Sequence, residues 1–210
     1  YFMRHFIFAI AISVFVVFPS FSQNEFETGK GNLSLGVRNT FSFFGGEHDS
    51  PGLGIGGHFR LQFSDRINSE WFADFIKSNI EGLAFRKDYH IGWSVQYYPV
   101  GKTVEQPTLF KPFIMAGHCF DYSQFSEIGG SNISVDKGWS SAVQAGIGTH
   151  LNLSSRFDIS LEAQYMIHLG KDIHADIHGD EIEFEVGDHS SLEGHLLITL
   201  SVNYKIADLW

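Results

Sequence analysis

Residues 157–169 read FDISLEAQYMIHL, and apolar and polar side chains alternate along most of this stretch. Residues 88–97 (DYHIGWSVQY) and 196–206 (LLITLSVNYKI) repeat the pattern. A period of two places successive side chains on opposite faces of an extended strand, whereas a helix has a period of 3.6 residues. The pattern therefore predicts β-strands with one apolar and one polar face.

The same alternation marks eight segments of the chain. They lie near residues 32–43, 53–64, 70–76, 88–97, 113–122, 139–153, 157–169 and 196–206. The start of 113–122 is apolar on both faces, so its register stays open. Several segments have ten residues or more, the length that a tilted strand needs to cross a bilayer. The sequence therefore predicts an all-β fold of eight strands.

The links between these segments differ in length. Residues 65–69 and 154–156 form tight links, and 101–107 forms a moderate one that contains proline. The other links are more polar and often longer, at residues 45–51, 77–87, 123–137 and 171–194. Short turns at one end and long loops at the other are typical of a membrane β-barrel.

The position of the tryptophans indicates which face is outside. All four follow the apolar parity or its extension: Trp71, Trp93, Trp139 and Trp210. Tryptophan is enriched where a barrel meets the membrane surface. The polar face combines glycine, serine and threonine with glutamine, histidine and both signs of charge, which suits a narrow lumen. The inverse arrangement, with apolar side chains inside, would make a secreted lipocalin-like small-molecule binder and stays an alternative.

Residues 1–22 have the features of an export signal. Arg4 precedes an apolar run over 6–18, and Ser20 and Ser22 supply small residues before a cleavage site. The run is too short for a transmembrane helix, which needs about 20 apolar residues. We therefore expect a signal peptide over 1–22 and one barrel domain over 23–210.

The export signal, the eight alternating segments and the terminal Trp210 together resemble the small outer-membrane β-barrel proteins of the OmpA/OmpX kind. The stretch from Lys111-Pro112-Phe113 to Ala116-Gly117 is similar to a strand start of that family. The resemblance covers residues 23–210, although Asp208 interrupts the apolar parity before the terminus. It implies an eight-stranded antiparallel up-and-down transmembrane β-barrel in the bacterial outer membrane. We expect the barrel to be monomeric or weakly associating and to contact lipid and lipopolysaccharide.

Charged residues on the polar face are expected to pair inside the lumen. The cations are Arg38, Arg60 and Lys205, and the anions are Glu70, Asp74, Asp88 and Glu162. An eight-stranded barrel has an interior just wide enough for side chains to fill. We expect a closed lumen, and the alternative is a narrow passive pore for ions or small solutes.

The sequence supports no enzymatic, cofactor or metal assignment. Lipid A deacylases of this shape carry a His-x-Ser-Asn motif, whereas this chain has His168-Leu169-Gly170-Lys171 without the serine. We expect Cys119 to be a small packed residue. Four strand histidines are expected to hydrogen-bond in the lumen: His58, His90, His118 and His150. A formal net charge of −10 argues against nucleic acid as a partner.

The segment 171–194 is the candidate interaction surface. Its acidic and histidine residues over 172–189 include the alternating His174, Asp176, His178 and Asp180. Whether they bind a divalent metal stays open, and the alternative is a solvated loop that is kept soluble by its charge. Apolar residues between them predict strands that continue beyond the membrane as a hairpin, whose edge can accept a protein partner. The expected function is non-enzymatic, either envelope integrity or surface interaction through long extracellular loops.

Overall fold

The computed structural model describes residues 30–44, 51–80, 82–100, 109–127, 135–178, 181–191 and 194–210. Within these ranges, side chains are not described for 44, 127, 135–136, 170–178 and 181–191. The expected export signal over 1–22 lies outside the described residues and stays a prediction. Among the described residues, no helix is long and apolar enough to span a membrane.

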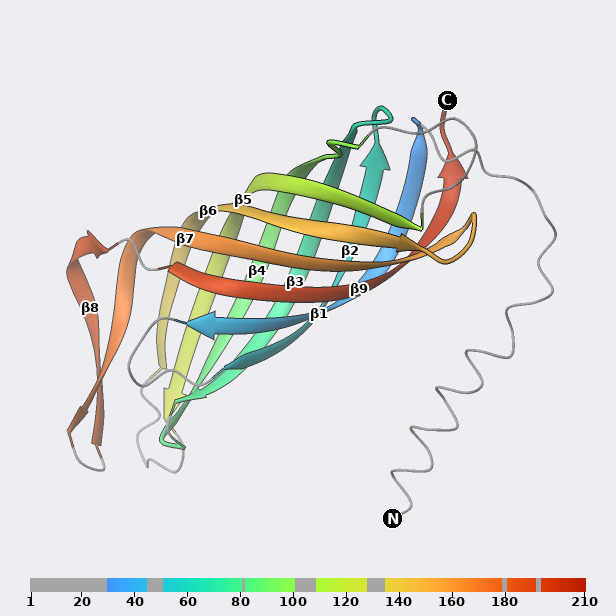
Figure 1. Cartoon of the computed structure of the whole chain (residues 1–210). Helices are drawn as coiled ribbons and strands as arrows, with labels where there is room; N and C mark the ends of the chain where they lie inside the picture. Colours follow the sequence, from blue (N-terminus) through green and yellow to red (C-terminus); the bar gives the residue numbers. More distant parts are fainter. Residues whose placement is uncertain are drawn as a thin grey trace, which may run out of the picture.

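The described chain forms nine β-strands. They are β1 (Asn32–Phe44), β2 (Gly52–Gln62), β3 (Ile67–Ile80), β4 (Ala84–Tyr97), β5 (Phe110–Glu127), β6 (Val135–Asn152), β7 (Phe157–His178), β8 (Glu181–Ser191) and β9 (Gly194–Asp208). Strands β1 to β7 pair in sequence, β7 pairs with β9, and β9 pairs with β1. Every pairing is antiparallel. Eight strands therefore close into a barrel (Figure 1), as the sequence predicts.

The ninth strand, β8, lies outside the barrel wall (Figure 1). It pairs with the distal half of β7, from Gly170 opposite Ser191 to His178 opposite Glu181, with a shift of register between Lys171 and Ile173. This confirms the hairpin expected within residues 171–194. Since β7 also pairs with β9 up to Ile167 opposite Gly194, the barrel closes without β8.

Two of the expected loops are largely strand. Strands β3 and β4 stay paired up to Ile80 opposite Ala84, so most of 77–87 belongs to the wall. Strands β5 and β6 stay paired up to Ser126 opposite Val135, so much of 123–137 does as well. Polar residues occupy both faces there, and the backbone ladder continues without the apolar alternation that marks a strand in the sequence.

The two tight turns use the same chemistry. Ser64 Oγ accepts a hydrogen bond from the Ile67 amide at 3.1 Å, and Ser154 Oγ accepts one from the Phe157 amide at 3.0 Å. A serine hydroxyl that bonds the backbone a few residues on stabilises a reverse turn. These turns define the short-turn end of the barrel, opposite the loop end that carries β7 and β8.

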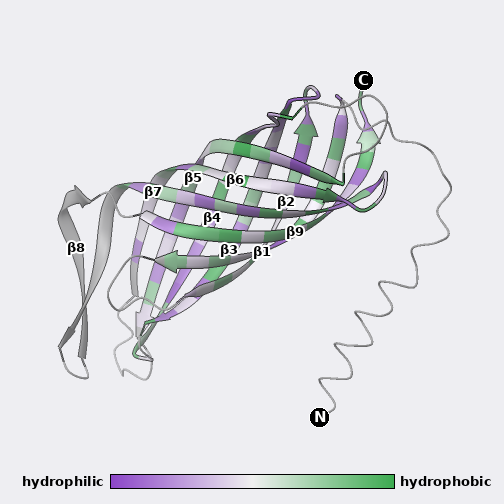
Figure 2. Ribbon diagram, viewed as in Figure 1, coloured by the Kyte–Doolittle hydropathy of each residue, from purple (hydrophilic) through white to green (hydrophobic). Residues whose placement is uncertain are grey.

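The apolar face points outward and the polar face points inward. Figure 2 shows hydropathy alternating along the strands, and the four tryptophan side chains are 40–73% exposed. Buried polar residues fill the interior instead, which excludes the lipocalin-like alternative. The open register of β5 is resolved as well: Phe113, Met115 and Cys119 point inward and are buried, whereas Phe120 points outward and is 56% exposed.

Candidate functional site

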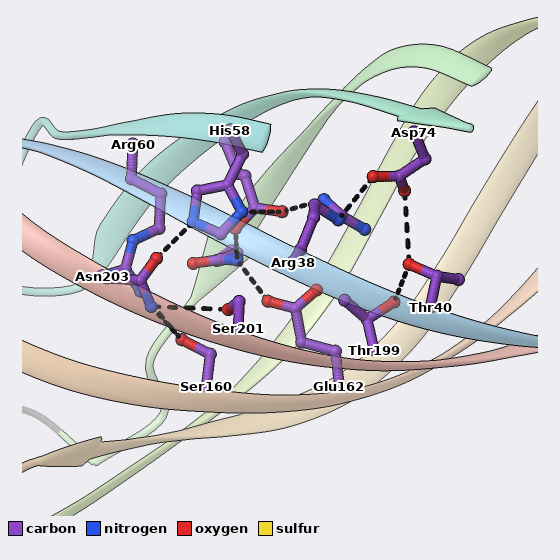
Figure 3. A network of polar contacts seen from close by, with 12 residues as sticks. Arg38, Thr40, His58, Arg60, Asp74, Ser160, Glu162, Thr199, Ser201 and Asn203 are labelled. Carbon is purple, nitrogen blue, oxygen red and sulfur yellow. Dashed lines mark hydrogen bonds and ion pairs between the residues drawn. The ribbon is translucent and has the colours of Figure 1, made fainter. Parts of the chain in front are cut away.

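Arg38 of β1 is at the centre of the lumen, where it binds two carboxylates of β3. Its Nη1 lies 2.8 Å from Glu70 Oε1, and its Nε lies 3.1 Å from Asp74 Oδ1 (Arg38 and Asp74 are labelled in Figure 3). All three side chains are buried. Arg38 reaches β3 across β2 because the residue between them is Gly56. A Cβ on Gly56 would collide with the Asp74 carboxylate, so this glycine keeps the ion pair possible.

Further polar contacts extend this network across the barrel (Figure 3). Thr40 Oγ1 donates to Asp74 Oδ2 at 3.5 Å and lies 3.2 Å from Thr199 Oγ1 on β9. From β4, Gln96 donates to Glu70 at 3.2 Å and to Glu162 of β7 at 3.4 Å. Side chains of five barrel strands therefore meet at the level of Arg38 and bridge the lumen.

A second ion pair closes the short-turn end. Arg60 Nη2 donates to both Asp158 oxygens at 2.8 and 2.7 Å, and the Asn203 amide donates to Asp158 at 2.9 Å. His150 Nδ1 lies 2.6 Å from Ser160 Oγ, and the Tyr98 hydroxyl lies 3.0 Å from His150 Nε2. Charge-assisted bonds of this kind are the stronger class of protein hydrogen bond.

An apolar layer lies on the loop side of Arg38. Its six side chains are at most 4% exposed: Phe72, Ile76, Cys119, Ala142, Met166 and Leu197. The Arg38 guanidinium lies 4.4 Å from the centroid of the Phe72 ring, so the polar network packs directly against this layer. Cys119 is confirmed as a small packed residue. An ion that crosses the barrel would have to lose its water here, and burying an unpaired charge is costly.

Three buried histidines and one aspartate lie beyond the apolar layer, toward the loop end. Asp121 lies 3.3 Å from His90 Nε2 and 3.5 Å from His168 Nδ1, and His168 Nε2 lies 3.2 Å from His195 Nδ1. Ser140 Oγ lies 3.1 Å from His168 Nδ1. A Ser-His-Asp triad uses both imidazole nitrogens, one for each partner. Here Ser140 and Asp121 approach the same nitrogen, so the group lacks the arrangement of a hydrolase triad.

No three His, Cys, Asp or Glu side chains are placed to hold a metal ion within the described part of the chain. The side chains over 172–178 and 181–189 lie outside the described residues, so the question of a metal in that segment is untested. Only their backbone register is known. It places His174 opposite Glu185, Asp176 opposite Glu183 and His178 opposite Glu181.

Most of the lumen residues expected from the sequence are confirmed. The expected pairing within the set occurs between Arg38 and both Glu70 and Asp74. Arg60 and Asp88 pair with residues outside that set: Arg60 with Asp158, and Asp88 with Arg86 at 3.0 Å. His58, His90 and His150 point into the lumen. The expectation that His118 lies in the lumen is wrong. The register of β5 turns its even-numbered residues outward, and the centroid of the His118 ring lies 4.8 Å from that of the Phe120 ring on the outer surface.

The lumen residues that the sequence did not predict include Arg86, Asp121 and His195. Arg86 falls within an expected loop, Asp121 lies in the strand of open register, and His195 precedes the expected last strand. The parity of their strands, once the strand ends are known, places all three inside.

The outer surface carries two rows of aromatic side chains. Nearer the short turns, Phe59, Trp71 and Trp93 follow one another with ring centroids 6.0 and 6.4 Å apart. Nearer the loops, one ring from each of β3 to β6 forms a second row with spacings of 5.1, 6.0 and 4.9 Å: Phe75, Tyr89, Tyr122 and Trp139. The two rows are four residues apart on β3 and β4, about 13 Å along the strand, which is less than the roughly 25 Å height of the apolar band of a transmembrane barrel. Only the row nearer the loops is followed by polar outward residues, so it marks the edge of the apolar band at that end.

The fold is similar to that of solved bacterial outer-membrane proteins. A major outer membrane protein from Thermus thermophilus matches with a TM-score of 0.57 and 11% identity, covering 83% of this chain and 99% of that chain. The N-terminal β-barrel domain of Pseudomonas aeruginosa OprF matches with a TM-score of 0.50 and 11% identity, covering 85% and 99%. No family model and no curated protein matches the sequence. The protein therefore has the fold of the small eight-stranded outer-membrane β-barrels, with an OmpA/OmpX-like architecture.

Proposed function

We propose that the protein is a non-enzymatic barrel of the bacterial outer membrane, with a lumen closed by its own side chains. Its role is envelope integrity or surface interaction through the loop end. The observation that carries this proposal is the buried network of Arg38, Glu70 and Asp74, packed against the apolar layer beside Phe72. Side chains thus occupy the path that a solute would take.

A closed lumen predicts the absence of channel activity. Refolded protein in a planar bilayer is expected to give no discrete conductance steps, provided that folding is first shown by the difference in gel mobility between unboiled and boiled samples. The matched variant is Phe72→Ala with Met166→Ala, which thins the apolar layer but keeps every ion pair. Reproducible openings from folded wild-type protein would contradict the closed lumen and favour the narrow passive pore.

Support for surface interaction comes from the β7–β8 hairpin. Its register separates two faces: Ile173, Ala175 and Ile177 lie opposite Val186, Phe184 and Ile182, and the ionisable pairs alternate with them. In the described chain β8 pairs only with β7, so its other edge offers backbone groups to a partner strand. An extended peptide of a protein partner is the ligand that such an edge binds.

A non-enzymatic role is the simplest interpretation of the histidine group. His168 is the residue that a deacylase would use, yet it points into the lumen and is 3% exposed. A lipid substrate would lie outside the wall, so the His168 ring has no access to it. We expect no acyl-ester hydrolysis by the folded protein in detergent, measured by fatty acid release.

A further inference from the structure

The outward face of the barrel strands is almost free of charge. Among the described side chains, its charged residues are three lysines and one acid near the chain end: Lys77 on β3, Lys87 on β4, Lys137 on β6 and Asp208 on β9. The three lysines lie on one side of the barrel. A charge on the lipid-facing surface is costly near the bilayer centre and is tolerated near the membrane surface. The position of these lysines along their strands therefore shows whether they can contact lipid headgroups.

The lysines lie in one row across four adjacent strands. Lys77 is directly opposite Lys87, Lys87 is opposite Gln124 of β5, and Gln124 is opposite Lys137. Neighbouring strands are about 4.8 Å apart, so the row is roughly 14 Å long. Like charges directly opposite each other destabilise a sheet. A row of this kind therefore favours a bound anion that neutralises it.

The lysine row lies beside the aromatic row at the loop end. Each member of Phe75, Tyr89, Tyr122 and Trp139 is two residues from a member of the lysine row, on the side of the short turns. Two residues along a strand span about 6.6 Å. Because aromatic belts mark the level of the lipid headgroups, the lysines reach the headgroup layer on its outer side. Lys77 Nζ also lies 3.8 Å from the centroid of the Phe85 ring.

We propose that Lys77, Lys87 and Lys137 form a binding site for the phosphate groups of lipid A in the outer leaflet. Lipid A carries a phosphate at each end of a disaccharide, and a row of roughly 14 Å with cations at both ends suits two separated phosphates better than one. The Gln124 amide between them can bind the sugar. This inference rests on the outer-membrane placement proposed above, but not on a closed lumen.

The test compares lipid binding by wild-type protein and by Lys77→Gln/Lys87→Gln/Lys137→Gln. Both are refolded in phosphatidylcholine micelles, titrated with bis-phosphorylated lipid A, and analysed by native mass spectrometry for retained lipid. Each lysine near an anionic lipid surface contributes about fivefold to binding, so the triple variant is expected to need roughly 100-fold more lipid A. The matched control removes three cations at the short-turn end: Lys30→Gln/Arg66→Gln/Arg156→Gln.

Each outcome decides the proposal. Loss of retention in the triple variant alone, with no retention of dephosphorylated lipid A, supports it. Equal retention by the triple variant, or equal retention of dephosphorylated lipid A, overturns it. Equal binding of phosphatidylglycerol would overturn the assignment to lipid A in favour of a general site for anionic lipid, and competition by inorganic phosphate would overturn it in favour of a site for free phosphate. If folded wild-type protein binds no anionic lipid, the proposed site is refuted, whereas the proposal of an outer-membrane barrel is unaffected.

Discussion

Arg38 is the buried cation at the centre of the polar network in the lumen. Its side chain is fully buried and forms ion pairs with the carboxylates of Glu70 and Asp74. Its guanidinium lies over the Phe72 ring, 4.4 Å from the ring centroid. Removing one partner of a buried ion pair leaves an uncompensated charge, whereas replacing all the charges is tolerated far better. The consequences of changing Arg38 should therefore depend on what is done to its partners.

We expect Arg38→Met to lower the free energy of unfolding by about 3–5 kcal/mol, because two carboxylates lose their cation in a closed interior. Arg38→Met/Glu70→Gln/Asp74→Asn should recover at least half of this loss. Urea titration in lipid vesicles, followed by tryptophan fluorescence, measures both values. The exposed Lys30→Gln is the control and should change stability by less than about 0.5 kcal/mol. A triple variant no more stable than the single one would show that charge compensation is not what Arg38 supplies.

At the scale of the element, β7 belongs both to the barrel wall and to the β7–β8 hairpin. Its first half pairs with β6 and β9 inside the barrel wall, and its second half pairs with β8 beyond it. The barrel half has polar side chains inside and apolar ones outside, as the membrane requires. The second half of β7 is held by backbone hydrogen bonds to β8, and no other described barrel strand pairs with β8.

We predict that the barrel folds without the hairpin. Replacing residues 173–190 by a short Gly-Ser turn should preserve the gel mobility shift of the folded barrel, because β7 and β9 still pair from Phe157 opposite Tyr204 to Ile167 opposite Gly194. The same variant should lose any protein partner that binds through the edge of β8. Failure of the shortened chain to fold would show that β8 stabilises the wall, in conflict with the observed pairing.

At the scale of the whole molecule, the two ends of the barrel differ. Strand β1 begins and strand β9 ends at the short-turn end, where the Leu209 amide donates to Gly31 O at 2.9 Å and the Gly31 amide donates to Gln62 O at 2.7 Å. The β7–β8 hairpin lies at the opposite end (Figure 1). In outer-membrane barrels the short turns face the periplasm and the long loops face the cell exterior.

This asymmetry predicts the orientation in the cell. Protease added to intact cells should cleave within residues 171–194, while an epitope placed after Trp210 should stay protected until the outer membrane is opened. Immunoblots of both fragments measure the result. Cleavage of the terminal epitope in sealed cells, with the hairpin intact, would reverse the proposed orientation.

The sequence by itself determined the barrel and the direction of its faces. A period of two is set by the backbone of each strand, and the tryptophans on the apolar parity reveal the lipid side without knowledge of any neighbour. The partners inside the lumen were only partly predictable. Arg38 and Glu70 were expected on the same face, but parity cannot say which strands lie across from each other at one level.

Only the tertiary structure decided the register of β5, the outward position of His118, the pairing of Arg60 with Asp158, and the row formed by Lys77, Lys87 and Lys137. These features depend on the stagger between strands, which sets the level of each residue along the barrel. A single strand carries no information about that level. The physical reason is that alternation is a local property of one strand, whereas stagger is fixed by hydrogen bonds between strands far apart in the sequence.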